Sequence, residues 1–143
     1  MIRRAFVFLA AAMALAVLAL LRLTGGAHAY DTSLRYPSEV ALSLEGEKGY
    51  VFRRFPGSQR LYTYDKDKPT RSACNIGCDG AHMPVLAPAD AMVMDEWSII
   101  DRDDGTRQWA FRGKPIYTAF HDPAGDPRGD GEDGVWHLVP YEK

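Results

Sequence analysis

Short stretches in which apolar and polar residues alternate run from about residue 39 almost to the end of the chain. A strand points successive side chains to opposite faces, so a strand with one buried face shows this period of two. In residues 39–44, EVALSL, the apolar residues Val40, Leu42 and Leu44 fall on one face. The same kind of pattern predicts further strands at residues 49–55, 60–65, 97–102, 106–112, 116–120 and 135–139.

Segments rich in Gly, Pro and Asp separate these stretches. The sequence FPGSQ at 55–59 predicts a turn, and DDG at 103–105 predicts a hairpin turn with Gly105 at a left-handed position. Residues 66–88 and 121–134 read as long irregular loops, and residues 89–96 as one helical turn. The fold class that follows is all-β, or β with one short helix, in a small single domain.

Two parts of the chain resemble each other at an offset of 55 residues. RLYTYDKD, residues 60–67, aligns with PIYTAFHD, residues 115–122, so that Tyr62 matches Tyr117 and Asp67 matches Asp122. In each copy a strand ends in an acid and a Gly/Pro/Asp-rich loop follows. We therefore expect two related β-meander repeats, at about residues 49–88 and 97–139.

The first 29 residues have the pattern of a secretory signal peptide. A short basic start, MIRR, precedes an uncharged apolar run, and AHA at 27–29 supplies the small residues of a cleavage site. We expect cleavage after Ala29, which leaves residues 30–143 as a periplasmic or secreted domain with no stable membrane span. An uncleaved anchor is the alternative.

The charge of the expected mature domain argues against a nucleic-acid partner. Three arginines fall in the leader, so residues 30–143 carry 14 basic and 19 acidic residues, a net charge of −5. Phosphate binding requires clustered Lys and Arg, which an acidic domain lacks. The expected partner is instead an unknown protein or small ligand in the cell envelope.

The segment SACNIGCDGAHMP, residues 72–84, contains both cysteines of the chain. Cys74 and Cys78 are four apart, and His82 and Met83 follow. In an oxidising compartment such a pair usually closes to a disulfide, which is our first expectation. Thiolate, thioether and imidazole together also suit Cu(I), so a periplasmic copper site made of these four residues is the alternative. A thiol–disulfide redox protein is a weaker alternative.

The loop at 121–134 is rich in carboxylates. Hard oxygen donors on such a loop suit Ca²⁺, although the spacing is not that of an EF-hand, and the competing interpretation is a solvated loop whose acids cap backbone amides. The acids in question are Asp122, Asp126, Asp130, Glu132 and Asp133. No set of convergent catalytic groups is evident, so we expect a non-catalytic binding or accessory domain.

Several tracts together resemble a known family. They are LYTYDKD, SACNIGC, DGTRQWAFRGKPIY, GDPRGDG and GVWH. The combination, over about residues 57–139, is similar to a secreted repeat family whose members include predicted lipoproteins with a Yx(F/W/Y)xxD motif. Tyr62, Tyr64 and Asp67 fit this motif fully. Tyr117 and Asp122 fit its second copy, with Ala119 at the place of an aromatic residue.

The resemblance implies fold, export and repetition, but no activity. The family usually has Trp-Pro-Pro shortly after the second cysteine, where this chain has His82, Met83 and Pro84. The loop tryptophan of the family is thus replaced by a pair of potential metal ligands.

Overall fold

The structure is a computed structural model that describes residues 35–75, 80–122 and 129–141. All of them belong to one compact unit, Leu34–Lys143. The expected signal peptide, residues 1–29, lies outside the described residues. Among the residues that are described, no helix has the length and apolar character needed to cross a membrane.

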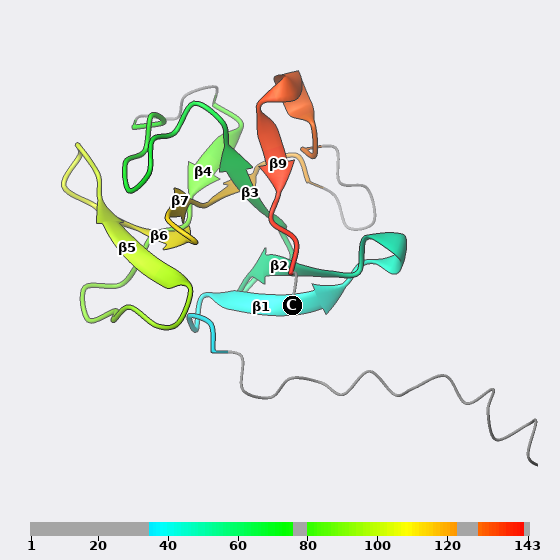
Figure 1. The fold of residues 1–143 in the computed structure, drawn as a ribbon, viewed down its shortest axis with the longest axis horizontal. Helices are drawn as coiled ribbons and strands as arrows, with labels where there is room; N and C mark the ends of the chain where they lie inside the picture. The colour runs from blue at the N-terminus through cyan, green and yellow to red at the C-terminus, as the bar shows by residue number, and fades with distance from the viewer. Residues whose placement is uncertain (1–34, 76–79, 123–128, 142–143) are drawn as a thin grey trace, which may run out of the picture. The chain divides into compact units, whose positions relative to one another are not determined.

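The described residues are almost entirely strands and loops, which confirms the expected β class (Figure 1). The strands are β1 (Val40–Leu44), β2 (Tyr50–Arg54), β3 (Leu61–Tyr64), β4 (His82–Pro84), β5 (Trp97–Asp101), β6 (Arg107–Phe111), β7 (Lys114–Pro115), β8 (Tyr117–Ala119) and β9 (Trp136–Leu138). Two 3₁₀ turns, η1 (Gly46–Lys48) and η2 (Glu132–Gly134), accompany them.

Two local expectations were wrong. Residues 89–96 form turns and irregular chain instead of a helical turn, and their last part is a tight turn in which Met94 and Trp97 exchange backbone hydrogen bonds. Residues 82–84, expected to be part of an irregular loop, form strand β4 on the edge of a sheet. Three residues that include a proline give no period-two signal, and Pro84 is tolerated because β4 is an edge strand.

The hairpin turn at Gly105 is confirmed. β5 pairs with β6 in register from Trp97↔Phe111 to Asp101↔Arg107, and Gly105 has a φ of 79°. A residue with a side chain rarely adopts this conformation, which explains the glycine. The Asp104 carboxylate accepts a hydrogen bond from the Thr106 amide at 3.0 Å and so fixes the turn.

The strands form three small sheets, with the orders β1-β2, β5-β6-β7 and β4-β8-β3-β9. In the four-stranded sheet every pairing joins a strand from the first half of the chain to one from the second. The two motif strands, β3 and β8, are central neighbours, with Tyr62 directly opposite Tyr117. The two copies of the motif therefore pair with each other.

Backbone hydrogen bonds between the two expected repeats follow one pattern. The Phe52 amide donates to the Val139 carbonyl at 3.4 Å, and the Trp109 amide donates to the Val85 carbonyl at 2.9 Å. The next bonds match as well, since Val139 donates to Leu61 and Val85 donates to Ile116. Each repeat thus binds the tail of the other.

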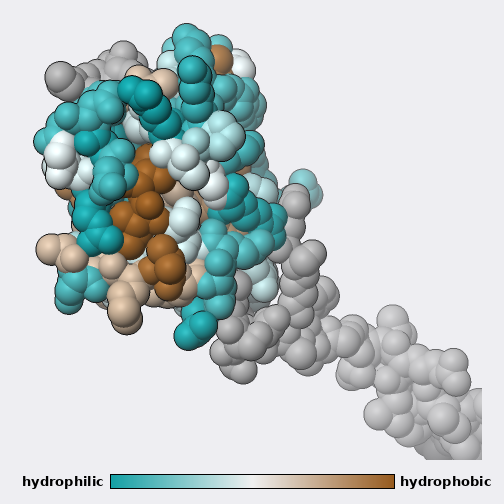
Figure 2. Space-filling model, turned by 60° about the vertical axis from the view of Figure 1, so that its left-hand side comes forward, coloured by the Kyte–Doolittle hydropathy of each residue, from teal (hydrophilic) through white to brown (hydrophobic). Residues whose placement is uncertain are grey.

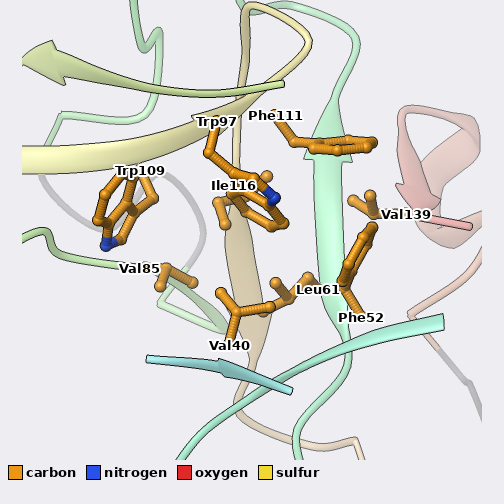
Figure 3. Packing of buried hydrophobic residues seen from close by; sticks show 9 residues of the cluster. All are labelled: Val40, Phe52, Leu61, Val85, Trp97, Trp109, Phe111, Ile116 and Val139. Atoms are coloured by element: carbon orange, nitrogen blue, oxygen red, sulfur yellow. The ribbon is translucent and has the colours of Figure 1, made fainter. Parts of the chain in front are cut away.

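The main hydrophobic core lies where the two hairpins and β3 meet (Figure 3). Its buried side chains come from both halves: Val40, Phe52, Leu61 and Val85 from the first, and Trp97, Trp109, Phe111, Ile116 and Val139 from the second. Phe52 packs edge-on against Trp97, with ring centroids 5.0 Å apart. Burying large aromatic side chains is a main source of stability in a domain of this size.

Candidate functional site

The motif tyrosines and acids meet across the two repeats. The Tyr117 hydroxyl of the second repeat donates to Asp67 of the first at 2.9 Å. At the matching place, the Tyr62 hydroxyl interacts with Asp122, although no hydrogen bond of regular geometry joins them. Burial raises the pKa of both tyrosines well above the ordinary value. The motif is therefore a contact between repeats.

Asp67 also holds the loop that follows its strand. Its other carboxylate oxygen accepts a hydrogen bond from the Ala73 amide at 2.7 Å. Burial raises the pKa of Asp67, while the hydrogen bonds from Ala73 and Tyr117 and the charge of Arg102 oppose this shift. The acid thus works as a half-buried acceptor that orders the segment leading to the first cysteine.

Arg102 fixes that same segment from the second half of the chain. Its guanidinium donates to the carbonyl of Cys74 at 2.9 Å and to that of Asn75 at 2.7 Å. It also donates to Gln108 and to Ser72, whose hydroxyl lies 2.7 Å from that of Tyr117. Reasoning from sequence missed Arg102, because an arginine at a strand end usually faces solvent.

The cysteine pair is only partly described. Cys74 is fully buried and is not a free thiol, whereas Cys78 lies outside the described residues. The disulfide between them therefore stays a prediction.

The described soft ligands do not converge on one site, and Cys78 lies outside the described residues. His82 is buried and stacks on Trp136, with ring centroids 3.6 Å apart and planes 6° apart. Met83 follows it on the strand, so its side chain points to the other face, where it is 52% exposed. Within residues 35–75, 80–122 and 129–141, no cluster of three or more His, Cys, Asp or Glu is placed to hold a metal ion. These findings do not support the copper site.

His82 occupies the place in the first repeat that Trp136 occupies in the second. Tyr62 meets His82 edge-on at 82°, and Tyr117 meets Trp136 edge-on at 84°. Trp136 also stacks on Tyr64, the second aromatic residue of the first motif. The histidine thus serves as an aromatic partner in a second core cluster that contains Tyr62, Cys74, Tyr117, Ala119 and Trp136.

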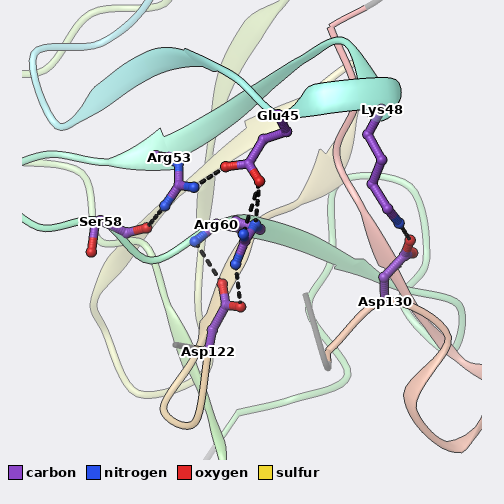
Figure 4. A network of polar contacts seen from close by, with 7 residues as sticks. All are labelled: Glu45, Lys48, Arg53, Ser58, Arg60, Asp122 and Asp130. Atoms are coloured by element: carbon purple, nitrogen blue, oxygen red, sulfur yellow. Dashed lines mark hydrogen bonds and ion pairs between the residues drawn. The ribbon is translucent and has the colours of Figure 1, made fainter. Parts of the chain in front are cut away.

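Asp122 belongs to a buried charge network that centres on Arg60 (Figure 4). Its carboxylate accepts hydrogen bonds from the Arg60 amide at 2.9 Å and from the Arg60 guanidinium at 2.7 Å. The Arg60 guanidinium also pairs with Glu45, which in turn binds Arg53. A carboxylate that is occupied in this way has little capacity left for a metal ion.

The other described acids of the predicted calcium loop do not form a metal-binding cluster. Asp130 pairs with Lys48 and accepts the Leu138 amide at 3.1 Å. Glu132 lies 3.6 Å from His82 Nε2, Asp133 is exposed, and Asp126 lies outside the described residues. The described part of the loop therefore agrees with acids that bind the protein's own groups.

An exposed apolar segment connects the two halves of the chain. In residues 86–96, Leu86, Met92 and Val93 are 48%, 77% and 68% exposed. Figure 2 shows apolar residues gathered on one face, on the side that carries β5 in Figure 1. Arg107 holds the segment in place, because its guanidinium donates to the carbonyls of Pro88, Ala89 and Ala91.

Comparison with known proteins identifies a family for part of this fold. Residues 98–140 match the family model described as a secreted repeat of unknown function. This is the family that the sequence motifs resemble, and the match covers the second repeat from β5 to β9. No curated protein and no solved structure matches the chain. The match supports a secreted repeat and leaves its activity open.

Proposed function

We propose that this chain is an exported accessory domain that acts by binding another protein in the cell envelope and carries out no catalysis. The observation that carries the proposal is the ordered apolar segment at Leu86, Met92 and Val93. Exposed apolar side chains on neighbouring positions of a small soluble domain are typical of protein-binding sites. The partner surface would be apolar, with few charges opposite the segment.

The placement of the histidines supports binding over catalysis. His82 is buried and stacks on Trp136. His137 lies on the exposed side of β9, where it contacts Asp65 at 2.8 Å, and His121 is exposed beside Asp122. A nucleophile with a general base would need such groups in one concave site. A redox role is also poorly supported, because a reactive cysteine needs access to its partner and Cys74 is fully buried.

Site-specific photo-crosslinking in the producing cell tests the proposal. A photoreactive residue at Met92 should give a discrete adduct with an envelope protein. The matched control is the same residue at Leu44, which is 65% exposed on the β1–β2 hairpin. Equal labelling at both positions, or no adduct at Met92, would contradict the proposal.

The export step has its own test. We propose that the mature protein begins at Tyr30, because Ala27 and Ala29 supply the small residues of the cleavage site. The intact mass of protein recovered from the envelope or medium should correspond to residues 30–143. A mass that includes the leader would instead indicate an uncleaved anchor.

A further inference from the structure

The two halves of the chain are interlocked. The first half, residues 35–86, supplies β3 and β4, and the second half, residues 97–141, supplies β8 and β9. These strands alternate in the order β4-β8-β3-β9, so each central strand has both of its neighbours in the other half. Two isolated bridges repeat the pattern, with Val51 opposite Pro140 and Leu86 opposite Gln108.

The buried polar contacts cross between the halves as well. Arg60 of the first half pairs with Asp122 of the second half, and both side chains are fully buried. Tyr117 reaches Asp67 in the same way, and Arg102 reaches the carbonyls beside Cys74. Since one half alone would leave these groups buried without partners, or exposed with an open core, neither half is complete by itself.

Only the linker, residues 87–96, makes the pairing intramolecular. We propose that the first half of one copy of this chain can pair with the second half of another copy. Two copies would then exchange halves in a closed, two-fold symmetric dimer. The first half of each copy would then form every contact described above with the second half of the other copy. Domain swapping of this kind needs no new interface, only a change in the path of the linker. This inference does not depend on the proposed function.

The path of the linker sets the condition for exchange. Leu86 lies opposite Gln108 on the β7 side of β6, whereas Trp97 lies opposite Phe111 on the β5 side. The linker must therefore cross β6. The two ends of the linker are two strand spacings apart across the sheet and three residues apart along the strands. Together these offsets give a distance of about 14 Å. Ten residues span this distance easily, whereas two residues reach only about 10 Å.

Shortening the linker in the full mature chain therefore tests the proposal. With residues 88–95 deleted, only Ala87 and Glu96 connect the halves, and each half has to find its partner in another copy. We expect a dimer by light scattering, with the near-ultraviolet circular dichroism of the intact protein. The matched control lacks residues 89–92, which leaves six linker residues with a reach of about 23 Å, and should be a monomer like the intact chain.

A mixing experiment distinguishes a dimer that has exchanged halves from a dimer of two complete monomers. Two mass-labelled samples of the 88–95 deletion should remain homodimers when mixed in the folded state, and should form hybrid dimers only after they are unfolded and refolded together. The proposal would be overturned by a folded monomer, an unfolded or aggregated product, or hybrids that form quickly without unfolding.

Discussion

Asp122 looks like a metal ligand in the sequence because it begins a loop rich in Asp and Gly. In the fold its carboxylate is fully buried against Arg60, which is itself fully buried. Two charges removed from water are tolerated when they pair with good geometry, and removal of one leaves the other uncompensated. In the fold, Asp122 therefore acts as the counter-ion of Arg60.

The first prediction concerns this pair. Asp122→Asn keeps the shape of the side chain but removes its charge, and should lower the free energy of unfolding by about 3 kcal/mol or more. The matched control is Asp130→Asn, which removes the partner of Lys48 near the surface and should cost less than about 1 kcal/mol. Urea denaturation of both variants measures the difference. Equal losses would mean that Asp122 does not act as the counter-ion of Arg60.

The second prediction uses the pKa of Asp67. Burial raises this pKa above its ordinary value of 3.8, so folded Asp67 keeps its proton to a higher pH than the unfolded chain does. Between the two pKa values the folded state binds more protons, and the free energy of unfolding must fall as the pH rises through this window. Asp67→Asn does not titrate there.

The measurement is the urea midpoint of the wild type and of Asp67→Asn from about pH 3 to pH 7, a range that begins below the ordinary pKa of the carboxyl group. The wild type should lose stability relative to the Asn variant as the pH rises above 3.8. If the urea midpoints of the two proteins change in parallel with pH, the Asp67 carboxyl group has the same pKa in the folded and the unfolded chain. That result would contradict a pKa raised by burial.

At the scale of strands and turns, the period-two patterns located most of the sheet. Residues 97–102 and 106–112 were predicted as a hairpin and form β5 and β6, because alternating apolar residues and a glycine turn are local signals. β4 has no such signal. Its position is fixed by pairing with β8, a strand more than thirty residues away, and only the fold supplies that partner.

The sequence predicted which residues make up the candidate site, but not which of them contact one another. The sequence singled out Tyr62, Tyr117, Asp67 and Asp122 as equivalent pairs. A tandem repeat suggests contacts within each copy, whereas the structure joins Tyr117 to the acid of the other copy. Such an exchange is a property of topology, which the spacing of residues along a chain does not encode.

The third prediction compares the two motif tyrosines. Tyr117→Phe removes a hydroxyl that donates to Asp67 and contacts Ser72, and should cost about 1–3 kcal/mol of unfolding free energy. Tyr62→Phe removes the equivalent hydroxyl, which makes no regular hydrogen bond, and should cost less. Thermal or urea denaturation orders the two. A larger loss for Tyr62 would show that its contact with Asp122 is the stronger one.

For the molecule as a whole, the question is what holds the domain together around residues 72–84, the stretch of sequence that contains both cysteines. Cross-linking Cys74 to Cys78 would close a ring of five residues, and chain entropy assigns such a ring about 2 kcal/mol. Arg102 fixes the same segment by charged hydrogen bonds to two carbonyls, and it joins the two halves while doing so. The guanidinium therefore contributes to global stability in a way that a local ring does not.

The last prediction follows from this comparison. In protein recovered from the producing cell, both cysteines should resist alkylation until a reductant is added, because exported pairs usually oxidise. Replacing both with Ala should lower the free energy of unfolding by no more than about 2 kcal/mol. Arg102→Leu should cost more, because the carbonyls of Cys74 and Asn75 and the side chain of Gln108 lose a charged donor inside the protein.

Reactive thiols in native protein, or a double cysteine variant less stable than Arg102→Leu, would show that the cysteines hold the domain together or serve another chemistry. Stoichiometric Cu(I) bound by the reduced protein and lost in the double variant would identify that chemistry as metal binding.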